Sequence, residues 1–147
     1  SKPESMPLGR DKRKYRRYRF PMYLEASMTI LKYLGRDVNV GSTLVLLQDI
    51  GAGGLCFYST LCLPVNSSLL IQFSTTLLGN HIDFYGVPVW RKEVKENLYK
   101  YGVAFKISEK RRKQLYSFIK QLELHIKSNP EELSGDFVHQ SPYSYFS

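Results

Sequence analysis

The sequence predicts a mostly β domain that ends in one amphipathic α-helix. From residue 22 onward apolar side chains occupy every second position, as Leu24, Ala26, Met28 and Ile30. Further short apolar runs follow with turn signals between them, and near the C-terminus the apolar spacing changes to three and four residues. Period two is typical of a strand with one buried face, and the longer period is typical of a helix. An all-β sandwich or barrel followed by a helix is therefore expected.

Turn signals divide the strand-like sequence. Residues 35–37 and 63–66 are typical of turns, and the glycine-rich residues 49–54 interrupt an apolar run as a loop. The expected strands are residues 22–30, 43–48, 55–60, 68–75, 81–92 and 98–107.

The helix is expected to begin after Ser108, a suitable N-cap, and to end at Asn129 before Pro130. Basic and polar residues, Arg112 among them, occupy the face opposite the apolar one. One face of the helix collects the apolar residues Leu115, Phe118, Ile119, Leu122 and Ile126.

With 147 residues, 43% of them hydrophobic, the chain is long enough for one folded domain. No apolar run approaches the roughly 20 residues that cross a bilayer, and residues 1–9 hold no signal-peptide core. We therefore expect a cytoplasmic protein. The expected organisation is a flexible N-terminal segment over residues 1–11, a domain over residues 12–127 and a flexible tail over residues 128–147.

The positive charge is concentrated at the start of the chain. Of the formal net charge of +8, residues 1–20 contribute +6, from eight basic and two acidic side chains. Such a cluster indicates an anionic partner, which could be nucleic acid, a phosphorylated small molecule or an acidic membrane surface.

No catalytic or metal-binding pattern stands out. His81, His125 and His139 are far apart, and Cys56 and Cys62 fit no zinc spacing, so that both thiols are interpreted as small buried hydrophobic groups. The sequence contains neither a nucleophile elbow nor a phosphate-binding P-loop. We therefore predict a protein that is not an enzyme and that uses no metal or cofactor.

Two motifs are spaced along the first third of the chain. Arg13 and Arg17 form R-x-x-x-R within residues 10–20, where seven of the first ten residues are basic. About thirty residues later, residues 49–54 form D-x-G-x-x-G. The basic run alone would be interpreted as a solvated arm, but its order and spacing with the second motif are more specific.

Over roughly residues 12–127 the chain resembles the PilZ domain family, in which R-x-x-x-R precedes [D/N]-x-S-x-x-G. Residues 89–91, which contain Trp90, and the strand pattern of residues 101–105 agree with later family strands. The resemblance implies a six-stranded antiparallel β-barrel with a C-terminal helix. It also implies a ligand, the bacterial second messenger cyclic di-GMP, which is a ring of two guanylates with two phosphates.

The resemblance assigns ligand-binding roles residue by residue. Arg13 and Arg17 match the family's arginines, whose guanidinium groups suit phosphate oxygens and the guanine O6/N7 edge. Asp49 matches the acidic position, and it could accept hydrogen bonds from guanine or orient an arginine. Gly54 matches the last glycine, where the backbone approaches the ligand or takes a positive φ.

Three further residues belong to the predicted site. Arg16 and Arg19 are neighbours of the motif arginines. They could help to bind the ligand, although they do not match the motif. Trp90 could stack on a base or be an ordinary barrel aromatic, and the sequence favours neither. Gly51 replaces the family's serine, and the missing hydroxyl could cost up to about tenfold in affinity.

The predicted function is a cyclic di-GMP receptor whose N-terminal arginine arm orders on binding and signals to a protein partner or an adjacent domain. The alternative is a PilZ-like protein-interaction module that does not bind the messenger. Nucleic-acid binding through the arm ranks last, because the rest of the chain has no second basic stripe. Motility, polysaccharide export and transcription are all compatible with the resemblance.

Overall fold

The computed structural model describes residues 15–129 and 135–147. Arg13 lies outside the described residues. The elements are β1 (Arg17–Tyr33), β2 (Arg36–Asp37), β3 (Ser42–Gly51), β4 (Gly54–Ser59), β5 (Leu69–Leu77), β6 (Asn80–Lys95), β7 (Leu98–Phe105), α1 (Glu109–Ser128), β8 (Phe137–Val138) and α2 (Pro142–Tyr145).

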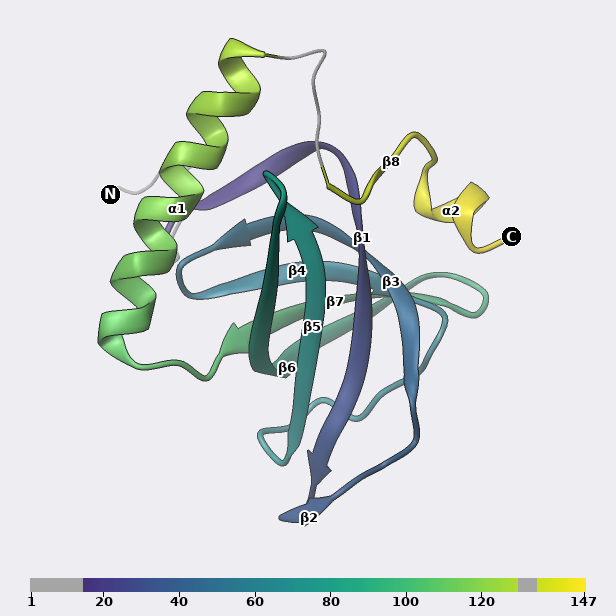
Figure 1. Cartoon of the computed structure of the whole chain (residues 1–147). Coiled ribbons are helices and arrows are strands. Elements are labelled where there is room, and N and C mark those ends of the chain that lie inside the picture. The colour runs from purple at the N-terminus through teal and green to yellow at the C-terminus, as the bar shows by residue number, and fades with distance from the viewer. Residues whose placement is uncertain (1–14, 130–134) are drawn as a thin grey trace, which may run out of the picture.

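Six strands are hydrogen-bonded in a closed ring (Figure 1). The order around the ring is β1–β3–β4–β7–β6–β5, and β5 pairs back to β1. Every pair is antiparallel. The 17-residue strand β1 closes the ring because it pairs with β3 over residues 17–29 and with β5 over residues 27–33. This arrangement confirms the predicted six-stranded antiparallel fold.

The core fills the inside of the ring, and α1 covers its side. Strand β5 buries every second residue, as its alternating sequence predicts. The ring of Phe57 stacks on Tyr101 with their centroids 4.7 Å apart. From α1, Ile119, Leu122 and Ile126 are buried in the same core.

Helix α1 agrees with the sequence prediction at both ends. The Ser108 side chain caps the first turn by accepting a hydrogen bond from the backbone N–H of Arg111, and the helix ends before Asn129. No helix within the described residues is long and apolar enough to cross a membrane.

Several strand boundaries differ from the expected ones, and two of these differences lie at the motifs. Strand β1 begins at Arg17 rather than at residue 22, because residues 17–19 pair with residues 49–51 of β3. The loop predicted over residues 49–54 is therefore mostly strand. Only Ala52 and Gly53 remain between β3 and β4 as the turn of a hairpin.

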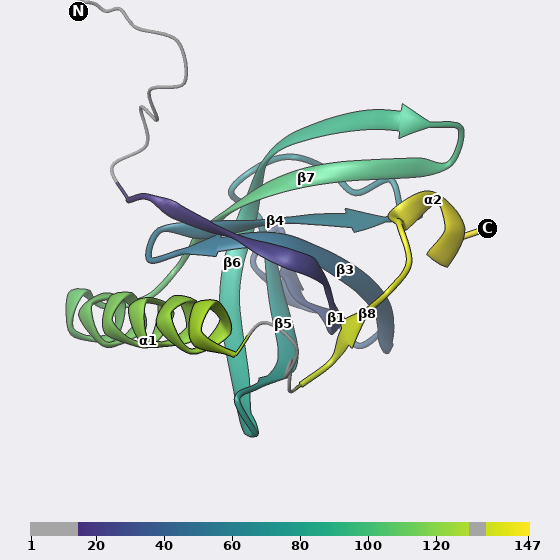
Figure 2. The same ribbon diagram turned by 90° about the horizontal axis from the view of Figure 1, so that it is seen from above.

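Residues 135–147 pack against β1, which differs from the flexible tail predicted for residues 128–147. Strand β8 pairs with β1 at Tyr23 and Leu24. The hydroxyl of Tyr145 donates a hydrogen bond to the Glu25 carboxylate. In both views α2 and α1 lie on opposite sides of the ring of strands (Figures 1 and 2). Aromatic packing holds the segment here, which the absence of periodicity in its sequence did not indicate.

Candidate functional site

The two sequence motifs are brought together by strand pairing. Arg17 lies opposite Gly51, and Arg19 lies opposite Asp49. Side chains two residues apart in a strand point to the same face, so Arg17 and Arg19 share one face of the arm and Arg16 faces the other way. We call these the Arg17 face and the Arg16 face.

On the Arg17 face a buried polar network orients the arginine. Arg17 Nη1 donates to Asp49 Oδ1 at 3.4 Å, and the two side chains are only 12% and 11% exposed. Gln48 Nε2 donates to Asp49 Oδ2 at 3.1 Å, and the Tyr58 hydroxyl donates to Gln48 Oε1 at 3.3 Å. Tyr58 orients Gln48, and Gln48 orients Asp49. Asp49 in turn holds the guanidinium of Arg17 in one position.

A β-bulge allows Gln48 and Asp49 to join the same network. The pairing of β3 with β4 shifts register between Leu47, which lies opposite Phe57, and Asp49, which lies opposite Cys56. The extra residue is Gln48, and it does not follow the strict alternation of a strand.

A second bulge brings Trp90 to the outer surface. The register of β6 against β7 shifts between Pro88 and Trp90. Trp90 lies opposite Gly102, where an added Cβ would meet the indole Nε1 at 2.0 Å, so the indole rests against the glycine backbone. Trp90 is 41% exposed, so its indole is not part of the buried core.

These side chains surround a hollow on the outer face of the ring, which we call the Trp90 hollow. Its volume is about 340 Å³. Three cationic side chains and one carboxylate line it, so it suits an anionic ligand with an aromatic part. The lining residues are Arg17, Arg19, Gln48, Asp49, Cys56, Trp90 and Lys100.

Two ionisable groups at or near this hollow, the Tyr58 hydroxyl and the Cys56 thiol, are uncharged at neutral pH. Burial is the main cause that raises the pKa of Tyr58 to about 12. Burial, and then the charge of Asp49, raise the pKa of the Cys56 thiol to about 12. Cys56 is therefore an unreactive buried thiol, whereas Cys62 is exposed, which corrects the prediction that both are buried.

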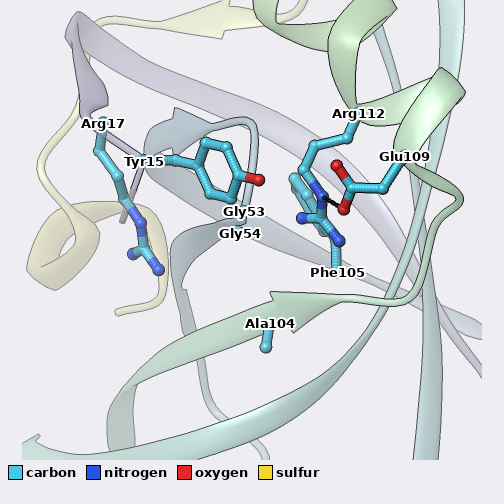
Figure 3. Close-up of a pocket in the computed structure, with 8 residues that line it drawn as sticks. All are labelled: Tyr15, Arg17, Gly53, Gly54, Ala104, Phe105, Glu109 and Arg112. Atoms are coloured by element: carbon cyan, nitrogen blue, oxygen red, sulfur yellow. Dashed lines mark hydrogen bonds and ion pairs between the residues drawn. The ribbon is translucent and has the colours of Figure 1, made fainter. Parts of the chain in front are cut away.

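Arg17 also borders a second hollow, on the helix side, which we call the Tyr15 hollow (Figure 3). Its volume is about 380 Å³. It is lined by Tyr15, Arg17, Gly53, Gly54, Ala104, Phe105, Glu109 and Arg112. Arg17 thus stands between two hollows of similar size.

The motif glycines let neighbouring strands and the arm approach each other closely, and they do not take unusual backbone angles. Neither Gly51 nor Gly54 has a positive φ, which corrects one of the two roles predicted for Gly54. A Cβ at Gly54 would lie 1.9 Å from the Val103 carbonyl oxygen and 3.1 Å from Arg17 Nη2. A Cβ at Gly51 would lie 2.7 Å from the Arg16 carbonyl oxygen. Gly54 thus leaves room for the guanidinium of Arg17, and Gly51 lets the arm lie against β3.

Arg16 belongs to the opposite face. Its Nη2 contacts the Glu123 carboxylate of α1 at 2.9 and 3.1 Å, and the two side chains are 71% and 35% exposed. The prediction that Arg16 helps to form the site is therefore not supported by its position.

The structure brings together Arg17, Asp49, Gly51, Gly54 and Trp90 of the predicted residues. Sequence reasoning named Arg19 only as a neighbour that could help, and it did not place Gln48, Lys100, Tyr15 or Arg112 in the site. Alternation along the arm would have selected Arg19 over Arg16 once the strand was known to start at Arg17. Nothing in the sequence pattern marked the other four. Among the described residues no group of three or more His, Cys, Asp or Glu side chains could hold a metal ion.

The chain shares its fold with several solved structures, two of which are complexes with c-di-GMP. Escherichia coli YcgR in complex with c-di-GMP shares 17% identity with a TM-score of 0.57, covering 82% of this chain and 50% of that one. The K. pneumonia MrkH–c-di-GMP complex shares 14% identity with a TM-score of 0.59, covering 80% and 55%. Bacillus subtilis MotI/DgrA, the inhibitor of motility, shares 16% with a TM-score of 0.54, covering 82% and 57%.

The chain thus spans only about half the length of these three proteins. At such identities they show a shared fold. No curated protein matches the chain in sequence. The family model described as PilZ domain matches residues 11–121, which include both motifs, the ring of strands and most of α1. The chain therefore belongs to the PilZ domain family.

Proposed function

We propose that this chain is a receptor for cyclic di-GMP that binds the messenger on the Arg17 face, rather than an enzyme. The observation that carries the proposal is the position of Arg17. Its guanidinium is held by Asp49 over Gly54 and lies between two hollows on the outer surface. The family match and the c-di-GMP complexes of YcgR and MrkH support the same ligand.

The chemistry of the Trp90 hollow suits the two parts of this ligand. Arg17, Arg19 and Lys100 offer donors to phosphate oxygens, and an arginine can also pair with the O6/N7 edge of guanine. The exposed indole of Trp90 offers a stacking face for a purine. With one carboxylate against three cations, the hollow complements a ligand that carries two phosphates.

We extend the proposal to the N-terminal arm. The described part of the arm, from Tyr15 on, already lies against the β3–β4 turn. We propose that messenger binding orders the arginine arm, residues 10–20, with Arg13 as a second ligand contact. The ordered arm would then be recognised by a protein partner or by an adjacent domain.

A calorimetric titration with cyclic di-GMP tests this function. Binding in the micromolar range or tighter is expected, and Asp49→Ala should abolish or strongly weaken it because Arg17 loses its partner. Cyclic di-AMP is the control, since adenine lacks the O6 acceptor. The absence of heat at high ligand concentration would overturn the proposal.

One observation favours the second candidate, an interaction module that does not bind the messenger. Gly51 stands where the family has serine, and the arm backbone already occupies the space beside it. Association with a protein partner that is unchanged by cyclic di-GMP and by Arg17→Ala would support this candidate.

A further inference from the structure

Besides the exposed pair of Glu123 with Arg16, helix α1 contacts the arm through Arg112. Its Nη1 donates to the Ala52 carbonyl oxygen at 3.1 Å, and its Nε donates to Glu109 Oε1 at 3.2 Å. The centre of its guanidinium lies 5.3 Å from the centroid of the Tyr15 ring. The side chain is only 17% exposed, although it lies on the face of the helix that the sequence predicts to be polar.

Tyr15 is held against the turn of the same hairpin. A Cβ at Gly53 would lie 2.9 Å from Tyr15 Cδ2, so the aromatic ring rests on the glycine backbone. Arg112 therefore contacts both the ring and the turn on which the ring rests. In Figure 3 the tyrosine extends across Gly53 and Gly54 toward Arg112 and Glu109.

This contact lies two residues before Arg17. The arm is fixed at two points: at Arg17, where the backbone pairs with Gly51, and two residues earlier at Tyr15, whose ring rests on Gly53. Asp49 orients the guanidinium of Arg17. Arg112 of α1 contacts Tyr15 and the Ala52 carbonyl, so the helix helps to fix the segment that leads into Arg17.

We propose that Arg112 is a positioning residue of the ligand site, acting through Tyr15 and the Ala52 carbonyl to fix the arm from which Arg17 extends. The inference rests on the proposed binding of cyclic di-GMP. It makes α1 a functional part of the site as well as a cover for the core. An arm released from Arg112 must be ordered at the moment of binding, and that ordering lowers the affinity.

The helix offers a matched control for charge. Arg111 is exposed, carries the same charge, and lines a different hollow with Asn80 and His81. Arg111→Ala and Arg112→Ala therefore change the net charge equally, but only the second removes the contacts with Tyr15 and Ala52.

The first experiment measures the affinity for cyclic di-GMP by calorimetry. Arg112→Ala is expected to bind about tenfold more weakly, from the loss of one cation–π contact and one hydrogen bond, while Arg111→Ala stays within about twofold. Arg112→Lys, which keeps the cation over the ring, should recover part of the loss. An unchanged affinity in Arg112→Ala, or an equal loss in Arg111→Ala, would overturn the inference while leaving the proposed function intact.

A double-mutant cycle separates positioning from general damage. Because Arg112 acts through Tyr15, the variant with Arg112→Ala and Tyr15→Ala should bind no more weakly than the weaker single variant. Losses that add in the double variant would contradict the inference.

A measurement on the ligand-free protein keeps this test independent of the proposed function. Trypsin should cleave after Arg16 or Arg17 faster in Arg112→Ala than in the wild type or in Arg111→Ala, because the arm opens more often. Equal cleavage rates would overturn the inference even if cyclic di-GMP binds. Faster cleavage in a protein that binds no messenger would support the role of Arg112 in holding the arm and overturn only its link to the ligand.

Discussion

The two faces of the arm carry neighbouring arginines with different surroundings. On the Arg16 face, the guanidinium contacts Glu123 at 2.9 Å, but the two side chains are 71% and 35% exposed. On the Arg17 face, the distance to Asp49 is longer, at 3.4 Å, but both side chains are nearly buried and Asp49 is held by Gln48.

Distance alone therefore does not identify the functional ion pair. Exposed pairs are screened by water and contribute about 0–1 kcal/mol. A nearly buried pair that is part of a network holds one geometry, which is what a binding site requires. Arg16 borders a hollow with Tyr18 and Glu123. Of the two arginines, Arg17 is the one that is nearly buried and held in a network, and it borders both the Trp90 hollow and the Tyr15 hollow.

Arg17→Ala should have the largest effect. It removes charge-assisted hydrogen bonds to the ligand that are each worth about 1.5–3 kcal/mol, so cyclic di-GMP should bind about 100-fold more weakly or not at all. Calorimetry measures the affinity, and thermal unfolding checks that the variant is folded. A wild-type affinity in a folded Arg17→Ala variant would remove the distinction between the two faces.

Gly54→Ala should disturb the framework under the Arg17 face. The new methyl group would overlap the Val103 carbonyl oxygen, and we expect a loss of about 1–3 kcal/mol in the free energy of unfolding. Denaturant titration measures it. Gly35→Ala is the control, because nothing lies within 4 Å of its Cβ position and only its φ of +78° is strained. Equal losses in the two variants would show that the close approach at Gly54 is unimportant.

Gly51→Ser restores the side chain of the family motif, yet we expect it to weaken binding by up to about tenfold. Its Cβ would lie 2.7 Å from the Arg16 carbonyl oxygen, so the arm must move away from β3. Gly51→Ala is the matched control, with the same Cβ and no hydroxyl. If the serine variant binds more tightly than the wild type, the hydroxyl outweighs the close contact and our account of the arm fails.

Arg16→Ala should have the smallest effect, with a change in affinity of no more than about twofold at physiological salt, because an exposed pair contributes little. Glu123→Ala should behave in the same way. Both are measured in the titration used for Arg17→Ala. A loss in Arg16→Ala comparable to that in Arg17→Ala would indicate that the arm acts through its total charge and not through one face.

The main architecture could be predicted from the sequence. The alternation from Leu24 to Ile30 and the helical spacing of Ile119, Leu122 and Ile126 both report on burial, which is a local property of each element. The structure confirms the strands and the helix on this basis. The sequence analysis also expected that Asp49 could orient an arginine, and Asp49 does contact Arg17.

The finer composition of the site could not be predicted, for two physical reasons. The bulges at Gln48 and before Trp90 break the period of two, so alternation gives no indication of which side chains reach the hollow. Arg112 lies on the helix face predicted to be polar, and its contact with Tyr15 depends on how the arm crosses α1. Such contacts arise from tertiary packing and leave no local pattern.

The fluorescence of Trp90 tests whether the ligand binds the Arg17 face. The chain has a single tryptophan, and it lines the hollow that contains Arg17 and Asp49. Titration with cyclic di-GMP is predicted to change the Trp90 emission in a saturable way, with the same dissociation constant as calorimetry gives. Binding heat without any change in Trp90 emission would place the ligand elsewhere and contradict the account.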